Sequence, residues 1–179
     1  RKFVNTIHSD GFLLAVFSDE HAKDVLSGAS CHVETYGFSP SADWVADNYR
    51  FQDGKGYFNL SHKGSKLSTF QLPMIGKHNI ENATAVAAMC IKLGLTIQEI
   101  QKGFTTFKGI KRRQEIIGVK NGVTVIDDFA HHPTAIRLTL EAVREAYPGQ
   151  RIWAVFEPRS ATCKRKVFED RLSHFQPSE

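Results

Sequence analysis

Two carboxylates and two imidazoles lie within six residues of one another: Asp127, Asp128, His131 and His132. The apolar residues just before them predict a strand, and Pro133 fits the first turn of a helix, where no N–H is needed. Two adjacent carboxylates would repel each other if both were buried and ionised, so one needs a partner or water. The segment predicts a strand end that brings polar groups to a site. An N-capping aspartate beside two solvated histidines would also explain it.

A metal-dependent hydrolase is one function that these four residues allow, because carboxylate and imidazole ligands together suit zinc, manganese or iron. However, four ligands within six residues cannot easily all point at one ion from an extended strand end. Metal that stays bound at a stoichiometric ratio through dialysis would favour this class.

A second polar group lies at His78, Asn79 and Asn82. The two asparagines are three residues apart, so they share one face of the first turn of a helix. A carboxamide offers a donor and an acceptor together, which complements an adenine edge. Helix capping by Asn79 would explain one asparagine but not the pair with His78. The alanine-rich residues 83–93 continue as the helix, and Gly94 closes it.

The polar groups need a scaffold, and the first 72 residues predict one. The apolar residues 11–17 predict a buried strand, residues 18–28 a helix and residues 31–37 a second strand, which together form the unit of an open parallel sheet. Residues 42–72 predict antiparallel hairpins with turns at Asp53-Gly54, Lys55-Gly56 and Lys63-Gly64. Their expected buried face comprises Trp44, Val45, Tyr49, Phe51, Tyr57, Phe58, Leu60, Leu67 and Phe70.

A hinge is predicted at residues 103–110, after a helix that starts with a capping box at Thr96 and Glu99. Four cations follow within six residues: Lys108, Lys111, Arg112 and Arg113. Residues 116–119 predict a strand that the Asn-Gly turn at 121–122 leads back into residues 123–128. A helix over 134–147, a buried strand over 152–156 and a helix over 164–175 complete an α/β pattern. A three-stranded sheet with helices on one face leaves an edge uncovered, so the C-terminus looks truncated.

Composition excludes several classes of protein. With 41% hydrophobic and 23% charged residues the chain is ordinary in balance, and no apolar run approaches the roughly 20 residues of a membrane span. The three cysteines, Cys31, Cys90 and Cys163, are far apart and suggest neither disulfides nor a zinc site. The net charge is +4, but the cations are dispersed, so we expect no nucleic-acid partner and no membrane. A cytoplasmic location is expected.

Three motifs, in order, resemble those of the Mur ligases, the ATP-dependent enzymes that build the peptide of bacterial cell-wall precursors. Residues 76–83 (G-K-H-N-I-E-N-A) look like the family's G-x-H-N-x-x-N-A, residues 107–115 resemble its hinge with R-R-x-E, and residues 126–134 resemble D-D-x-x-H-H-P-T of the branch that uses UDP-N-acetylmuramate. Residues 156–162 (F-E-P-R-S-A-T) are closer to the E-P-R-S-x-T of the recycling branch, the murein peptide ligases, than to the Q-P-H-R-Y-T of the branch that adds L-alanine.

The resemblance implies a reaction. Such ligases phosphorylate a substrate carboxylate with ATP, and an amine then displaces phosphate to form an amide. For the recycling branch it implies UDP-N-acetylmuramate as the carboxylate and the tripeptide L-alanyl-γ-D-glutamyl-meso-diaminopimelate as the amine, in peptidoglycan recycling. The alternative within the family is ligation of L-alanine. From another class, a non-catalytic nucleotide-binding module stays open beside the hydrolase.

The resemblance also assigns residues, motif by motif. It places His78, Asn79 and Asn82 at the adenine. Arg113 would reach the ATP phosphates, where a guanidinium fork matches phosphate oxygens. Asp128 would accept hydrogen bonds from the ribose hydroxyls. His131 and His132 would lie close to the nucleotide or the acyl phosphate as the catalytic candidates. The residues expected to hold the incoming peptide's carboxylates are Arg159, Ser160 and Thr162.

The chain departs from the family in one respect. It contains no G-x-x-x-x-G-K-[ST] phosphate loop, and the family's magnesium-site lysine would also lie upstream. We therefore expect an internal fragment, in which residues 1–107 form the back half of the central ATP-binding domain. Residues 108–179 are expected to begin the Rossmann-like C-terminal ligase domain. The ligands of Mg²⁺ would lie mostly elsewhere, and this stretch alone should be inactive.

Overall fold

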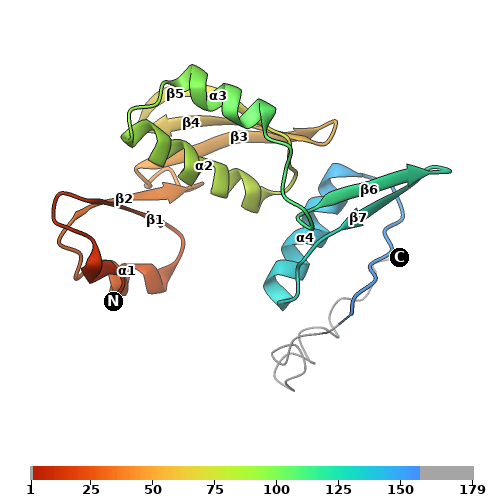
Figure 1. Ribbon diagram of the computed structural model, residues 1–179, viewed down its shortest axis with the longest axis horizontal. Coiled ribbons are helices and arrows are strands. Elements are labelled where there is room, and N and C mark those ends of the chain that lie inside the picture. Colours follow the sequence, from red (N-terminus) through yellow and green to blue (C-terminus); the bar gives the residue numbers. More distant parts are fainter. Residues whose placement is uncertain (1, 158–179) are drawn as a thin grey trace.

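The computed structural model describes residues 2–157, and its first part forms the predicted parallel unit (Figure 1). A short 3₁₀ turn, η1 (Val4–Thr6), precedes β1 (Phe12–Val16), α1 (Glu20–Leu26) and β2 (His32–Gly37). Strands β1 and β2 pair in parallel, as the strand–helix–strand pattern predicts. These two parallel strands form one edge of a larger sheet.

Three longer strands complete this sheet: β3 (Trp44–Gln52), β4 (Lys55–His62) and β5 (Ser65–Leu72). The strand order is β1-β2-β3-β4-β5, with β2 and β3 parallel and the last three strands antiparallel. Two of the predicted turns are confirmed, because both residues of Asp53-Gly54 and of Lys63-Gly64 have positive φ, as hairpin turns with a matching twist require.

The predicted turn at Lys55-Gly56 is wrong, because both residues belong to β4. Gly56 is required there by packing and not by a turn. A Cβ atom on Gly56 would lie 2.8 Å from Ile80 Cδ1 and 3.0 Å from the Met74 carbonyl oxygen. The glycine thus lets the helix that carries Ile80 approach the strand closely.

Two helices, α2 (Lys77–Lys92) and α3 (Ile97–Thr106), cover the sheet and enclose the core. The capping box of α3 is confirmed: Thr96 Oγ1 accepts from the Glu99 N–H, and Glu99 Oε2 accepts from the Thr96 N–H. The largest fully buried apolar side chains are Trp44, Phe58, Leu60, Phe70 and Ile80. Each contributes about 1.5–3 kcal/mol by leaving water. The expectation for Leu67 is wrong, since it is 37% exposed.

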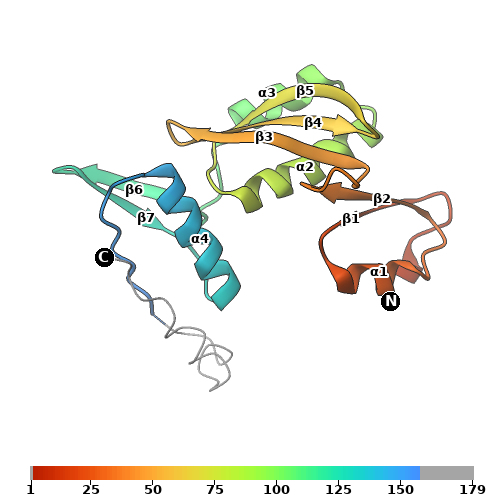
Figure 2. The same cartoon turned by 180° about the vertical axis from the view of Figure 1, so that it is seen from behind.

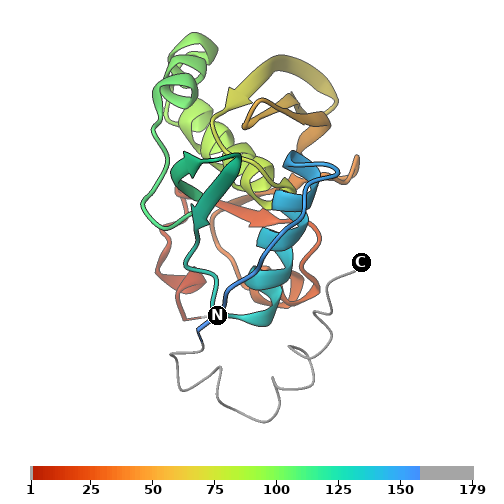
Figure 3. The same cartoon turned by 90° about the vertical axis from the view of Figure 1, so that its right-hand side faces the viewer.

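Residues 107–114, called the hinge from here on, lead from α3 to a second body. This body comprises β6 (Glu115–Lys120), β7 (Val123–Asp127) and α4 (Pro133–Ala146). Strands β6 and β7 form an antiparallel pair, and Asn121 and Gly122 have the positive φ of the predicted turn. Figure 1 and Figure 2 show this body beside the sheet and α2, and in Figure 3 it faces the viewer.

The predicted strand over 152–156 is wrong. In the part of the chain that the structure describes, these residues belong to no helix and pair with no strand, and Trp153 and Val155 are 76% and 97% exposed. A buried strand needs a neighbour to satisfy its N–H and C=O groups. The predicted helix over 164–175 lies outside the described residues. Among residues 2–157 no helix is both long and apolar enough to cross a membrane.

Candidate functional site

The start of α2 lies directly against the second body. The helix begins at Lys77, so that Asn79 and Asn82 lie in its first turns as predicted, because Gly76 takes φ 94° and ends the preceding loop there. A Cβ atom on Gly76 would lie 2.7 Å from the Cβ of Ala142 on α4. Only glycine allows this approach, which brings the side chains of the first turn of α2 to the joint between the two bodies.

Asn79 connects this turn to the hinge. Its side chain is buried, and its Nδ2 donates to the Ile75 carbonyl oxygen at 2.8 Å and to Gln114 Oε1 at 3.2 Å. It does not cap the helix, since the N-cap is Gly76 and no side chain caps it. Asn82, one turn further on, is exposed. Of the two asparagines, therefore, only Asn79 is bound into the joint.

Asp128, at the end of β7, is held from three directions. Its Oδ2 accepts from the Gln114 N–H at 2.9 Å, and its Oδ1 accepts from the Ala130 N–H at 2.7 Å and from Thr139 Oγ1 at 3.3 Å. These donors come from the hinge, the loop after β7 and α4. Asp128 does not cap α4, whose N-cap residue is His132. Asn79 and Asp128 thus meet through one residue, Gln114.

The neighbouring carboxylate takes a different partner. Asp127 Oδ2 lies 3.6 Å from Arg112 Nε, and both side chains are largely exposed. The prediction that at least one of the two carboxylates needs a partner is therefore confirmed for both. The two adjacent carboxylates thus point to separate partners.

The two arginines of the hinge gather around Phe129. The guanidinium carbons of Arg112 and Arg113 lie 4.8 Å and 5.6 Å from the centre of the Phe129 ring, within the range of cation–π attraction. The Phe129 N–H also donates to the Arg112 carbonyl oxygen at 2.7 Å. Sequence reasoning missed both Phe129 and Gln114. Each occupies an unspecified position inside a motif that was otherwise identified.

His131 and His132 stand at the start of α4 and are both exposed. His131 Nδ1 lies 3.0 Å from the Phe129 carbonyl oxygen, and its ring meets the Phe129 ring edge-on at 5.0 Å. Among the described residues no three His, Cys, Asp or Glu side chains are close enough together to hold a metal ion. The structure therefore provides no ligand set for a metal-dependent hydrolase in this region.

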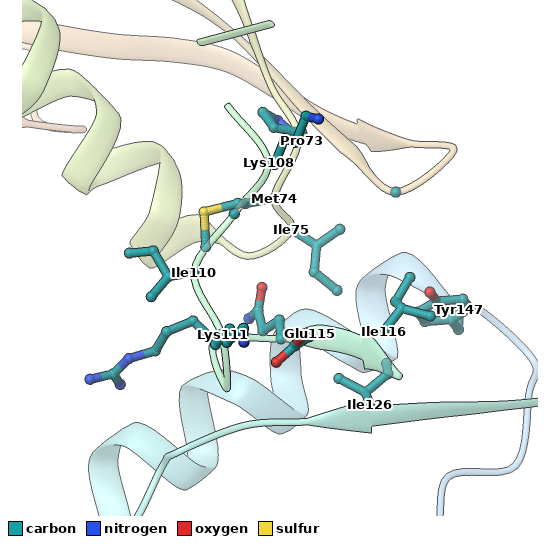
Figure 4. A pocket seen from close by; sticks show the side chains of 14 residues that line it. Pro73, Met74, Ile75, Lys108, Ile110, Lys111, Glu115, Ile116, Ile126 and Tyr147 are labelled. Carbon is teal, nitrogen blue, oxygen red and sulfur yellow. The ribbon is translucent and has the colours of Figure 1, made fainter. Parts of the chain in front are cut away.

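Two cavities flank these residues. One, of about 480 Å³, lies between the 73–75 linker, the hinge and β6–β7, and its lining includes Arg113 and Gln114 (Figure 4). Figure 4 shows Ile75 pointing from the linker towards Ile116 and Tyr147. The other cavity, of about 780 Å³, lies between β7, α4 and residues 150–157, and Asp128 and His131 line it. Both volumes suit small-molecule ligands.

The His78 imidazole is half-buried beside Gly76, and its buried Nδ1 has no hydrogen-bond partner among the described residues. Burial lowers the pKa of His78 below its ordinary value of 6.5, while the nearby Asp128 carboxylate acts in the opposite direction. The folded protein therefore prefers the neutral ring. Below pH 6.5 the unfolded chain binds more protons than the folded one at this position.

Stability should consequently fall as the pH drops through 6.5, and part of this loss should come from His78. We expect the His78→Gln variant to lose less stability than the parent between pH 8 and pH 5.5, because glutamine does not titrate. Urea denaturation at several pH values measures the difference. Parallel curves for the two proteins would show that His78 does not titrate differently on folding.

The expected peptide-binding residues, Arg159, Ser160 and Thr162, lie outside the described residues. The structure brings together Asn79, Gln114, Asp128 and the Arg113–Phe129 pair, with His78 close to Asp128. The arrangement offers amides, a carboxylate and a guanidinium at one joint. These are the groups that bind a base, a sugar hydroxyl and a phosphate, respectively.

Two family sequence models match the chain: the Mur ligase middle domain over residues 1–90, and the Mur ligase, glutamate ligase domain over residues 112–176. The UDP-N-acetylmuramate--L-alanine ligase of Alkaliphilus metalliredigens is 38% identical over 98% of this chain and 38% of its own length. The same enzyme of Clostridium acetobutylicum is 39% identical over 97% of this chain and 38% of its own length. The chain thus spans little more than a third of these relatives.

Solved structures agree with this similarity. MurF from Acinetobacter baumannii superposes with a TM-score of 0.72 at 25% identity, covering 80% of this chain and 31% of that one. A murein peptide ligase from Psychrobacter arcticus superposes with a TM-score of 0.63 at 33% identity, covering 95% of this chain and 36% of that one. The similarity continues across the joint, since it covers nearly the whole chain.

Proposed function

The chain belongs to the Mur ligase family, and we propose from this premise that it is part of an ATP-dependent ligase that forms an amide bond on a cell-wall precursor. We further propose that residues 1–107 belong to the central ATP-binding domain and residues 108–179 to the C-terminal ligase domain. The observation that carries the proposal is the bridge from Asn79 through Gln114 to Asp128, which joins residues of both parts that we propose to bind the nucleotide.

The proposed reaction has two steps. A carboxylate oxygen of the precursor attacks the γ-phosphorus of ATP, so that an acyl phosphate forms and ADP leaves. The amine nitrogen then attacks the acyl carbon, phosphate leaves, and the nitrogen loses a proton to give the amide. A developing negative charge on phosphate oxygens is common to both steps, and Arg113 is proposed to stabilise it.

Magnesium does not fit the described residues, since they contain no cluster of three possible ligands. We therefore assign no residue of this stretch to Mg²⁺. Asp128 is proposed to bind the ribose instead. An ionised carboxylate has about four acceptor positions, and the protein fills three of those on Asp128, which leaves one on Oδ2 for a hydroxyl. His131 and His132 are proposed to lie near the transferred phosphate.

The Asp128→Asn variant should raise the Michaelis constant for ATP several-fold, because the amide NH₂ would face either the Gln114 N–H and the ribose hydroxyl or, in the flipped orientation, the Ala130 N–H. Steady-state kinetics of the full-length protein with varied ATP measure the effect. Asp43→Asn is a matched control, because Asp43 accepts two hydrogen bonds from Thr35 far from the joint. An effect confined to the Michaelis constant of the amine would contradict the ribose role.

We propose UDP-N-acetylmuramate as the carboxylate substrate and L-alanine as the amine. Support comes from relatives named UDP-N-acetylmuramate--L-alanine ligase that are 38–39% identical over at least 97% of this chain. A second candidate amine is the tripeptide L-alanyl-γ-D-glutamyl-meso-diaminopimelate. It is favoured by the E-P-R-S-A-T segment at 157–162 and by the 33%-identical murein peptide ligase, and in that case Arg159, Ser160 and Thr162 would hold the tripeptide's carboxylates.

The test is phosphate release by the full-length protein with ATP and UDP-N-acetylmuramate, with each amine supplied separately. Release that needs L-alanine and yields an amide product supports the main proposal, and release that needs the tripeptide supports the second. No release with either amine would overturn the proposed ligase function for these substrates.

A further inference from the structure

Two side-chain amides meet at the joint, and their hydrogen bonds leave one NH₂ group and one carbonyl oxygen without a partner among the described residues. Asn79 uses both N–H donors, one to the Ile75 carbonyl oxygen and one to Gln114 Oε1, so only its Oδ1 remains available. Gln114 accepts from Asn79 through Oε1, while its Nε2 is buried and has no partner among the described residues. Together the pair retains the Asn79 acceptor and the Gln114 donor.

A buried donor without a partner is rare in folded proteins, because leaving it unpaired costs the full loss of hydration. Gln114 cannot easily move away from this position. Its backbone takes the left-handed conformation at φ 53°, and its N–H is bonded to Asp128 Oδ2. The side chain is thus held between the hinge and α2 by contacts on both sides, with its donor unused. Such an arrangement points to a ligand that supplies an acceptor.

Gln114 also lines the cavity of about 480 Å³ beside the hinge, which is large enough for a nucleobase. Adenine carries a donor, its 6-amino group, next to a ring-nitrogen acceptor, N7 on one side and N1 on the other. An amide reads the 6-amino group and N7 together by offering one acceptor and one donor. Asn79 by itself cannot do so, because its donors are already used, but the pair can.

We propose that Gln114 is a specificity-determining residue for the base of ATP: its Nε2 donates to a ring nitrogen of adenine while Asn79 Oδ1 accepts from the 6-amino group. This inference rests on the proposed use of ATP. Nε2 is covered in the structure, so the residues that cover it move aside when the base binds. The family's R-R-x-E pattern leaves this position unspecified.

The decisive variant is Gln114→Glu, which keeps an acceptor for Asn79 and replaces only the donor. Gln114→Met, which removes both groups at similar size, provides a second variant in case the glutamate disturbs folding. Gln101→Met is the matched control, because Gln101 bridges α3 to Ser68 and Thr69 on β5, away from the joint. Circular dichroism and thermal melting establish that each protein is folded.

Calorimetric titrations of the full-length proteins with ATP, 7-deaza-ATP and 1-deaza-ATP test the proposal. The parent and the Gln101→Met control should bind one of the two analogues about tenfold more weakly than ATP, the loss expected for one hydrogen bond. Both Gln114 variants should bind ATP about tenfold more weakly than the parent does. They should bind that same analogue as tightly as they bind ATP. A penalty for the analogue that persists in the Gln114 variants would overturn the proposal.

The two proposals can fail separately. If the parent protein binds ATP with these analogue preferences but releases no phosphate with any amine, the ligase function falls and the role of Gln114 stands. If the parent ligates with ATP and accepts both deaza analogues as well as ATP, the ligase function stands and the role of Gln114 falls. Absence of ATP binding in the parent would overturn both.

Discussion

Replacing Arg113 by lysine should lower the turnover of the full-length ligase at least about tenfold, which corresponds to roughly 1.4 kcal/mol of transition-state stabilisation. A guanidinium binds two phosphate oxygens at once through its planar fork, whereas an ammonium group acts as a point charge. In the structure the Arg113 guanidinium is exposed beside the Phe129 ring and one residue from the Asp128-bound Gln114. It is therefore free to approach a nucleotide phosphate at the joint.

Measurement of kcat at saturating substrates checks this expectation. Arg50→Lys is the matched control, because the Arg50 guanidinium also lies over an aromatic ring, that of Tyr57, at 4.6 Å, but on β3 away from the joint. A similar loss in both variants would point to a general effect of losing a stacked arginine. Unchanged kcat in Arg113→Lys would remove Arg113 from the phosphate site.

The second large effect concerns stability and the buried carboxylate of Glu34, which is 1% exposed. Its two oxygens accept from Trp44 Nε1 at 2.6 Å, from Lys63 Nζ at 2.9 Å and from Lys92 Nζ at 3.0 Å. His32 and His62 add imidazole contacts at 3.1 Å and 3.2 Å. Burial would raise the pKa of Glu34, but hydrogen bonds from these cations and from Trp44 hold it well below its usual range.

We expect Glu34→Leu to lower the free energy of unfolding by about 3 kcal/mol. Removal of one partner from a buried charged network leaves the others without compensation, and here it strands the buried Trp44 N–H. The effect should stay near the lower end of the range for such networks, because the Lys63 and Lys92 side chains are 53% and 31% exposed and can turn to water.

Urea denaturation of the parent and the variant at pH 7 measures this loss. Glu141→Gln is the control, since Glu141 forms one exposed ion pair with Arg137 on α4 and should contribute less than about 0.5 kcal/mol. Equal stability of Glu34→Leu and the parent would show that apolar packing replaces the network fully, as happens for some buried ion groups.

Local chemistry determined most of the elements from the sequence alone. The turns at Asp53-Gly54 and Asn121-Gly122 have the positive φ that their residues favour, and the Thr96 capping box starts α3 as predicted. The errors arose where spatial neighbours, or their absence, decided the outcome: residues 152–156 have no strand to pair with among the described residues. Gly56 lies within β4, where the absence of a side chain lets Ile80 pack closely, and it forms no turn. Gly76 lies against Ala142 and is the N-cap residue of α2, before the alanine-rich residues.

The sequence by itself identified the polar residues other than Gln114, and the strand ends and helix starts that carry them, because turn chemistry, capping and periodicity act within a few residues. Only the tertiary structure decided how they meet. Asn79 reaches Gln114 across 35 residues, and Lys92 reaches Glu34 across 58. Such contacts depend on how helices and strands pack, and no local pattern records that packing. For this reason only the fold, which brings α2 against the hinge, makes Asn79 and Gln114 a hydrogen-bonded pair.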